Sequence, residues 1–500
     1  MSRANWLDKA IGFVSPQRGA ARMQARMKIA RTAVVRNLYE GASLGRRTDG
    51  WRAVGTDANA ETRESISRLR DVARDMVRNN GYAARAKSTI KHNVVGAGIV
   101  PAIEAKTPKR KAAVEALLKA HIESTDIDAD GRLNIYGLQA LAMATIVEAG
   151  EVLIRRRLRR VEDGLNLPLQ IQVLEPDFLD TSFDGVQPNG NLAVQGVEFD
   201  LRGKRVAYYL FDEHPGSTTA GAGRAYRGKR VSADLVAHVY SVDRPGQVRG
   251  VSWFAPVMVR MRDFADLADA QLIKQKIAAC FAGFITGGET GELDEATGQE
   301  RSRTGNPIEN FEPGMIERLG EGESITFAEP PQTSDFSPYS TVTLREIAAG
   351  LNIPYEVLTG DLTGVNFSSG RMGWLEYQRS IDGWRWNMLI PAMLDPVARW
   401  LIDAVNVVTM STEPFRIGWT PPRREMINPT EEIGSAIKAI RGGMNSRSDE
   451  IRKLGYDPVE VDREIAADNA RADSLGIVLD SDPRKVSAAG LVQATPAGPA

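Results

Sequence analysis

Residues 249–284 constrain the fold of this chain more than any other stretch, because they predict one unusually long helix. Between Pro256, which suits the first position of a helix, and Phe281 there is no glycine or proline, so about 26 residues could form a helix of roughly 39 Å. A narrow stripe of mostly small apolar side chains recurs along it at helical spacing: Met261, Ala265, Ala268, Leu272 and Ala279. The stripe indicates close helix packing, although a long helix at the edge of a large core explains this segment equally well.

The composition is that of a globular chain without strong bulk charge. Hydrophobic residues make up 42% and charged residues 25% of its 500 residues, enough for roughly two to four domains. The formal net charge of -1 argues against a protein that coats nucleic acid, so any contact with DNA must be local. No stretch reaches the roughly 18 apolar residues of a membrane span, and no secretory signal is present. We therefore expect no membrane partner, and a cytoplasmic location unless an assembly carries the chain elsewhere.

Positive charge concentrates at the start of the chain, where residues 1–50 hold ten basic and three acidic side chains. Arg18, Arg22 and Arg26 recur every four residues and would line one face of a helix. Such a face suits DNA phosphates or an acidic protein surface. A merely solvated arm is the alternative, and the sequence leaves both open.

Residues 51–250 mix helical and strand patterns and predict one α+β domain. Helices are expected over 59–92 with a break at Asn79-Asn80-Gly81, then 82–95, 109–121 and 135–149. Strands are expected over 150–160, 169–174, 195–201, 205–211 and 235–240. In the first of these strands Arg155, Arg157 and Arg159 share one face, which we interpret as solvated.

After the long helix the sequence changes character. Residues 287–307 are polar and contain several glycines, 315–319 and 324–327 are short strand candidates, and a helix is predicted over 341–350. This indicates a small, independent excursion from the chain. Residues 359–373 follow as a predicted loop, rich in glycine, serine, threonine and asparagine, between two helical segments.

The C-terminal part predicts further helices. One helical face carries Trp374, Tyr377, Ile381, Trp384 and Met388, which at this spacing are core side chains rather than stacking platforms for nucleobases, and we expect the helix to break at Pro391 and Pro396. Two capping sequences, starting at Asn428 and Asp457, each place a proline in the first turn and a glutamate three residues along. The small-residue C-terminus predicts disorder.

No catalytic constellation is evident. None of the four histidines has a second ligand at metal spacing, and the single cysteine, Cys280, excludes an internal disulfide and reads as a buried, inert thiol. Residues 216–221 have the glycine step of a phosphate loop but lack its Lys-Ser/Thr, and Asp126, Asp128 and Asp130 lack the remainder of a calcium loop. We expect no catalytic residue, no metal and no cofactor, and a structural or conduit role.

Four blocks, in order, resemble the lambda-type bacteriophage portal protein family. They are RNNGYAARAKSTIKHNVVGAGI (78–99), GVEFDLRGKRVAYYLF (196–211), HVYSVDRPGQVRGVSWFAPV (238–257) and REIAAGLNIPYEVLTGDLTGVNFSSGRMGWLEY (345–377). The resemblance runs from about residue 60 to about 475. Where the family pattern has Asn-Tyr-Ser-Ser, this chain has Asn366-Phe367-Ser368-Ser369.

The resemblance implies a portal-type α+β fold with wing, helical stem, small clip and helical crown, assembled as a homo-oligomeric ring, typically of twelve subunits. Such a ring occupies one capsid vertex beside the major capsid protein. Double-stranded DNA is packaged and ejected through it without sequence specificity, and terminase and then the head–tail adaptor dock onto it. The implied location is the virion, with the host cytoplasm during assembly. A DNA-processing enzyme subunit and a channel-less minor capsid or adaptor protein are the alternatives.

The resemblance also assigns regions. These are a basic N-terminal arm (1–50), wing (51–250), first stem helix (251–285), clip (286–335), second stem helix (336–358), tunnel loop (359–373), wing and crown helices (374–428), crown helices (429–476) and a disordered tail (477–500). In the tunnel loop, Asn366, Phe367, Ser368, Ser369 and Arg371 are the expected DNA-channel residues, which would touch the DNA backbone without reading bases.

Overall fold

The computed structural model describes residues 11–36, 42, 46–218, 227–279, 283–286, 324–327, 336–423 and 428–479, apart from 12, 48, 53, 455 and 457. The chain divides into two units, Met1–Asp57 and Ala58–Ala500. In the first unit, helix α2 (Pro16–Arg36) carries Arg18, Arg22 and Arg26 at four-residue spacing, so the predicted helical arm is confirmed. Its binding role stays a prediction.

The second unit opens with a helical layer. Its helices are α3 (Ala58–Arg63), α4 (Ile66–Asn79), α5 (Gly81–Val95), α6 (Pro108–Ile122) and α7 (Ile135–Ala149). The predicted break between α4 and α5 is confirmed: the Asn80 side chain accepts hydrogen bonds from the backbone N–H groups of Tyr82 and Ala83 and so starts a new helix. Helix α7 has the predicted bounds and buries most of its side chains.

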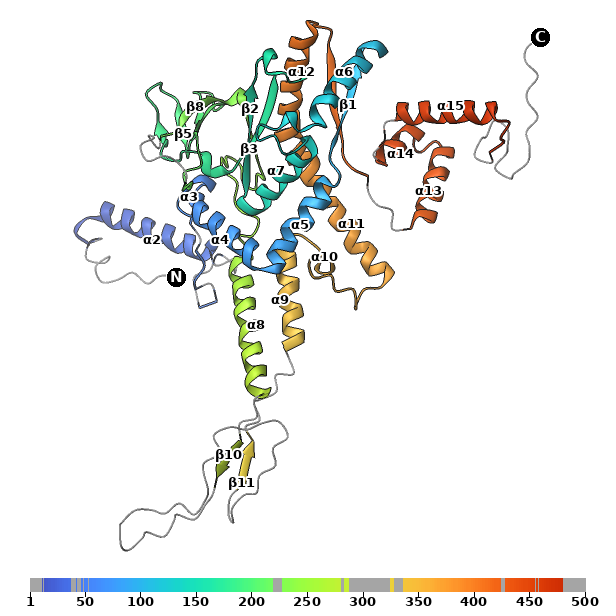
Figure 1. Ribbon diagram of the computed structural model, residues 1–500. Coiled ribbons are helices and arrows are strands. Elements are labelled where there is room, and N and C mark those ends of the chain that lie inside the picture. The colour runs from blue at the N-terminus through green and yellow to red at the C-terminus, as the bar shows by residue number, and fades with distance from the viewer. Residues whose placement is uncertain are drawn as a thin grey trace, which may run out of the picture. The chain divides into compact units, whose positions relative to one another are not determined.

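Two antiparallel sheets lie next to this layer (Figure 1). The three-stranded sheet has the order β3–β2–β9, with β2 (Glu151–Leu158), β3 (Leu169–Leu174) and β9 (Val236–Tyr240). The five-stranded sheet runs β4 (Gly185–Val186), β5 (Leu192–Val194), β6 (Val197–Phe199), β7 (Arg205–Leu210) and β8 (Lys229–Ser232). Short 3-10 helices lie between successive elements: η2 (Thr125–Ile127) between α6 and α7, and η3 (Val161–Asp163), η4 (Pro176–Phe178) and η5 (Ala233–Leu235) between strands. A small apolar core joins the two sheets, and a larger core joins the helices to the first sheet.

The long helix is α8 (Met258–Ala279), and α9 (Phe336–Gly350) lies beside it (Figure 1). Beyond α8, strands β10 (Gly283–Thr286) and β11 (Ser324–Phe327) form an antiparallel pair, and β11 has the predicted bounds. Helix α9 begins five residues before its predicted start. Pro338 falls in its first turn, where backbone N–H groups have no partner within the helix, so a proline there costs no hydrogen bond. The strand candidate at 315–319 and Cys280 lie outside the described residues.

After the short helix α10 (Tyr355–Thr359), helix α11 (Phe367–Trp384) continues without a break into a π-helix, η6 (Arg385–Leu394), and then into α12 (Asp395–Thr409). The expected interruptions at Pro391 and Pro396 are therefore wrong. The wider π winding accommodates the ring and missing N–H of Pro391, and Pro396 occupies the first turn of α12. The predicted aromatic face is confirmed as core: Tyr377, Ile381 and Met388 are buried, and Trp374 and Trp384 pack against them.

The remaining strands, β1 (Val100–Ala105) and β12 (Phe415–Thr420), pair antiparallel. The chain ends in α13 (Pro429–Arg441), α14 (Arg447–Lys453) and α15 (Pro458–Ser474). The Asn428 side chain accepts from the N–H of Glu431, which confirms the predicted cap of α13. Most of the tail predicted to be disordered, 480–500, lies outside the described residues. Among the helices that are described, none combines the length and apolarity needed to span a membrane.

Candidate functional sites in the stem, the loop and the stem root

The first half of α8 is fixed to its neighbours. Met261 and Phe264 are buried in the large core, and the ring of Phe264 lies edge-on to Tyr82 of α5, with ring centroids 6.0 Å apart. An ion pair between Arg260 and Glu346, 3.1 Å long, joins α8 to α9. At the end of α9, a Cβ on Gly350 would lie 2.4 Å from the side chain of Val257, so this close approach requires glycine.

In the second half of α8, most of the side chains that are described, up to Lys276, are exposed. Of the predicted stripe, Met261 is buried, Ala265 and Ala268 are half-buried, and Leu272 is 51% exposed; Ala279 lies in α8, but its side chain is not among those described. Ile273, next to Leu272, is 57% exposed. The stripe is therefore a core face only near its start.

Phe264 is the main buried aromatic side chain of α8, and the sequence analysis missed it. Phe254, Val257, Met261 and Phe264 recur at spacings of three and four residues and are all buried. That pattern was visible in the sequence and would have set the buried face correctly.

The predicted loop at 359–373 is shorter in the structure. Helix α10 ends at Thr359 and α11 begins at Phe367, so four of the five predicted DNA-channel residues are helical. Asn366 is the N-cap: its side chain accepts from the N–H of Ser369 at 2.8 Å, and the Ser369 hydroxyl accepts from the N–H of Asn366 at 3.1 Å. This reciprocal cap starts the helix inside the glycine- and serine-rich segment.

The remaining loop, residues 360–366, is ordered by its own side chains. Asp361 accepts from the N–H of Thr363 at 3.0 Å, from the Thr363 hydroxyl at 2.6 Å and from the Tyr355 hydroxyl at 3.1 Å. These hydrogen bonds, those from Thr363 first, hold the pKa of Asp361 below its ordinary value. Ser368, at the helix start, is exposed, whereas the side chain of Phe367 is not among those described.

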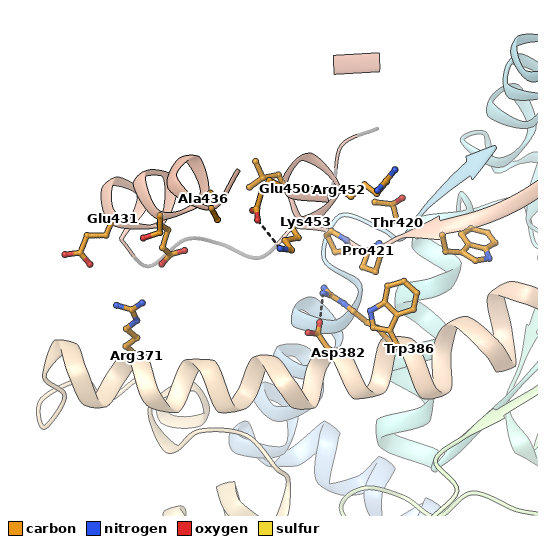
Figure 2. Close-up of a pocket in the computed structure, with 17 residues that line it drawn as sticks. Arg371, Asp382, Trp386, Thr420, Pro421, Glu431, Ala436, Glu450, Arg452 and Lys453 are labelled. Atoms are coloured by element: carbon orange, nitrogen blue, oxygen red, sulfur yellow. Dashed lines mark hydrogen bonds and ion pairs between the residues drawn. The ribbon is translucent and has the colours of Figure 1, made fainter. Parts of the chain in front are cut away.

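Arg371, the last predicted DNA-channel residue, lines a cavity of about 840 Å³ (Figure 2). Asp382 and Trp386 contribute from the same continuous helix, and Glu431 and Lys453 from α13 and α14. Figure 2 shows Arg371 directed from α11 toward the acidic side chains of this cavity. Arg371 thus shares its surroundings with charged groups of its own chain.

The root of the stem is a buried ion pair between Arg249 and Glu151. The arginine Nε and a terminal nitrogen lie 2.9 Å and 2.5 Å from Glu151 Oε1, and a second terminal nitrogen donates to the carbonyl of Gln195. Glu151 Oε2 also accepts from the N–H of Gly250 and lies 2.9 Å from His238 Nε2. Burial alone would raise the pKa of Glu151, but the Arg249 charge and the His238 hydrogen bond lower it far below its ordinary value.

Two glycines let the backbones meet at this root. A Cβ on Gly250 would lie 2.3 Å from the carbonyl oxygen of Gly150, and a Cβ on Gly150, whose φ is 91°, would lie 2.3 Å from the backbone of Val251. Only glycine fits both positions. The RPGQVRG block, on which the family resemblance partly rests, therefore attaches the start of β2 to the segment that enters α8. Its partner Glu151 carried no signal in the sequence beyond an acid inside a strand pattern.

Glu175, Asp177 and His214 form the one group of possible metal ligands among the described residues. Arg74 contacts both carboxylates, at 3.2 Å from Glu175 and 2.5 Å from Asp177. His214 Nδ1 accepts from the N–H of Gly216, and His214 Nε2 lies 3.3 Å from Glu175 and 3.9 Å from Asp177. Arg74 and the two carboxylates therefore form an ion-pair network.

Comparison with known proteins defines the class. Residues 44–385 match the family model described as "Phage portal protein, lambda family". This is more than half of the chain, and the protein is therefore a phage portal protein. More narrowly, it belongs to the lambda family, which confirms the resemblance seen in the sequence.

Several relatives align over most of their length. The probable portal protein of Halomonas phage phiHAP-1 is 27% identical over 460 residues, covering 88% of this chain and 87% of the relative. Portal protein B of Escherichia phage lambda is 22% identical, and the alignment covers 84% of this chain and 87% of the relative. A chain of the virion of a native gene transfer agent particle is similar at 16% identity and a TM-score of 0.45, covering 85% of this chain and 99% of that one.

Proposed function

We propose that this portal protein assembles into a closed homo-oligomeric ring, with about twelve subunits as the family resemblance implies, at one vertex of the capsid. In this proposal, α8 and α9 of each subunit form the stem around an axial channel for double-stranded DNA. The observation that carries it is the unequal burial of α8: Phe264 is packed in its own chain, whereas Leu272 and Ile273 are half exposed. Neighbouring stems would cover these side chains.

The C-terminal helices support the same proposal. Helix α13 has an apolar stripe that includes Ile433 and Ile437, yet none of its side chains is buried. An amphipathic helix without a core of its own is stabilised by packing against another surface. As crown helices at 429–476, α13 to α15 would find that surface in adjacent subunits.

The near-neutral charge of the chain suits a channel through which DNA moves better than a surface that binds DNA tightly. Each phosphate neutralised by a lysine or arginine adds affinity through counterion release, which would slow translocation. With a net charge of -1, the chain holds DNA loosely and without sequence specificity. The loop at 360–366 is the proposed tunnel loop, and Ser368 on the exposed first turn of α11 lies next to it.

The remaining roles follow from a ring at a capsid vertex. The clip at 286–335 would receive terminase during packaging and the head–tail adaptor afterwards, while the wing at 51–250 would contact the major capsid protein. The protein would be located in the host cytoplasm during assembly and then in the virion. This is a structural role without catalysis, which accords with the ion-paired state of the Glu175 and Asp177 carboxylates.

Negative-stain electron microscopy and sedimentation of the purified full chain test the proposal. Annular particles with an axial hole, and a mass near twelve chains of 54.6 kDa, are expected. A particle of similar mass without a hole would favour an adaptor role, and a monomer at high concentration would contradict the ring.

A further inference from the structure

Three arginines, Arg155 and Arg157 of strand β2 and Arg159 directly after its end, form what we call the arginine row. Two of them are held by glutamines of the neighbouring strand β3. Arg157 donates to Gln172 Oε1 through Nε at 2.8 Å and a terminal nitrogen at 2.5 Å, and Arg159 Nε donates to Gln170 Oε1 at 2.7 Å. The row is therefore arranged by amide groups before any partner arrives.

Further hydrogen bonds fix one of these glutamines. Gln170 Nε2 donates to the carbonyls of Asp126 and Asp128, at 3.0 Å each. Because its amide nitrogen is used in this way, its oxygen is directed at Arg159. A solvated face would not need such an arrangement, since a free arginine is fully hydrated.

The arginine row has no direct ion pair within the part of the chain that the structure describes. No carboxylate there forms an ion pair with any of the three side chains, whereas Arg156, on the opposite face of the same strand, pairs with Asp403 at 2.9 Å. The nearby Asp212 already pairs with Lys229 at 2.5 Å. Burial, and then the charges of Arg155 and Arg159, lower the pKa of Arg157, and the more distant carboxylates of Asp212 and Asp130 only partly oppose this.

We propose that the arginine row docks an extended acidic segment of another protein chain. Alternate side chains of an extended segment repeat at roughly 6.5 Å, which is also the repeat of alternate side chains along β2. Gln172 occupies the Nε side of the Arg157 guanidinium group. The outer edge of this group, formed by its two terminal nitrogens, can still donate two hydrogen bonds to a carboxylate. Three charges in a straight line, in a chain with net charge -1, fit one acidic strand better than a DNA duplex.

The end of β2 also lacks a paired strand on one side, among the strands that the structure describes. Strand β9 begins at Val236, opposite Arg155, and the register with β9 stops there. From Arg156 to Leu158, β2 pairs with β3 on one side, and among the described strands none pairs with it on the other. A segment that adds to this edge would place its side chains beside Arg157 and Arg159.

Fluorescence anisotropy with the purified full chain tests whether the arginine row binds an acidic extended segment. The probe is a labelled peptide of about twelve residues in which glutamate alternates with threonine, and the matched probe has glutamine in place of glutamate. The variant R155Q/R157Q/R159Q should bind the acidic peptide at least about tenfold more weakly than the wild type, and neither protein should bind the glutamine peptide. The variant R78Q/R379Q/R471Q removes three exposed arginines that are paired within their own helices, and it should bind like the wild type.

Three results would overturn the proposal. The first is an unchanged affinity of the row variant for the acidic peptide, and the second is an equal loss of affinity in the control variant. The third is binding of an unlabelled DNA duplex that is tighter than binding of the peptide and that disappears in the row variant. The last result would make the row a phosphate site. If the circular dichroism spectrum shows that the triple variant is misfolded, R159Q, whose side chain is exposed, should still weaken peptide binding about threefold.

Discussion

Arg249 and Glu151 form a fully buried ion pair, with the arginine Nε 2.9 Å and 3.0 Å from the two carboxylate oxygens. Arg249 precedes α8, the proposed stem helix, and Glu151 opens β2, so the pair attaches the segment that enters α8 to the sheet. Both charges are removed from water, and each depends on the other for compensation. The integrity of the stem root should therefore respond strongly to the loss of either partner.

Replacement of the arginine tests this dependence. Arg249→Met leaves Glu151 buried without its cation and should lower the free energy of unfolding by about 3–5 kcal/mol. Urea denaturation at one fixed protein concentration measures the change. The control is Arg244→Gln in the same RPGQVRG block: its ion pair with Glu61 is 2.7 Å long but about half exposed, so the loss should stay below about 1 kcal/mol. Equal losses in the two variants would refute the role of the buried pair.

His238 should make stability depend on pH. Burial lowers its pKa below the ordinary 6.5, so the folded state keeps it neutral while the unfolded state takes up a proton as the pH falls through 6.5. Its contribution is fully present above about pH 6.5 and declines below it, by at most about 1.4 kcal/mol per pH unit. Glu151, whose pKa is lowered, adds a further loss only below about pH 4.5. His238→Gln should flatten the decline of the melting temperature between about pH 6.5 and 5.5; an unchanged slope would exclude His238 as its source.

Phe264 should contribute to the stability of the single chain. Phe264→Ala leaves a cavity between α8 and Tyr82 of α5 and should cost about 3 kcal/mol in urea denaturation. A loss below about 1 kcal/mol would show that α8 is not anchored at this point.

Leu272 and Ile273 should contribute to assembly instead. The double variant Leu272→Ser, Ile273→Ser changes side chains that are half exposed in one chain, so its helix content should match the wild type. If neighbouring stems cover these side chains, the variant should shift from large particles toward monomers in sedimentation. Phe264→Ala is the matched control for general destabilisation, and wild-type assembly of the serine variant would remove the proposed stem contact.

The tunnel loop can be shortened without removing the cap of α11. Deletion of residues 362–364 spares Asn366 and Ser369, which hold the helix start. We expect particles to assemble but to lose most of their packaged DNA, measured as DNA per particle. Asn80→Ala, which removes the cap of α5, controls for the loss of a helix cap outside the loop; it should cost about 1 kcal/mol of stability and leave DNA retention intact. Full retention after the deletion would reject the tunnel-loop assignment.

Local patterns in the sequence predicted much of the fold. The bounds of α7, β3 and β11 followed from apolar periodicity. Asn79-Asn80-Gly81 marked the break between two helices, and Asn428 marked a helix start because capping depends on neighbours only. The sequence misled at residues 367–373, where glycine and serine predicted a loop but the Asn366–Ser369 cap starts a helix. At Pro391, a break was expected because a π-helix has no simple sequence signature.

The stem root could not be predicted in the same way. Glu151 and Arg249 are 98 residues apart, and neither pattern nor spacing indicates that they meet. The arginines of β2 were predicted to be a solvated face, because their glutamine partners become visible only when the register with β3 is known. Contacts between distant segments depend on the whole fold and not on either segment alone.

A cryo-electron microscopy reconstruction of the purified full chain tests the central claim most directly. We predict a closed ring in which α8 and α9 surround an axial channel and Leu272 and Ile273 are covered by an adjacent subunit. A reconstruction with α8 on the outer perimeter, or with both side chains still exposed to solvent in the assembled particle, would contradict the assignment of this hairpin as the channel stem.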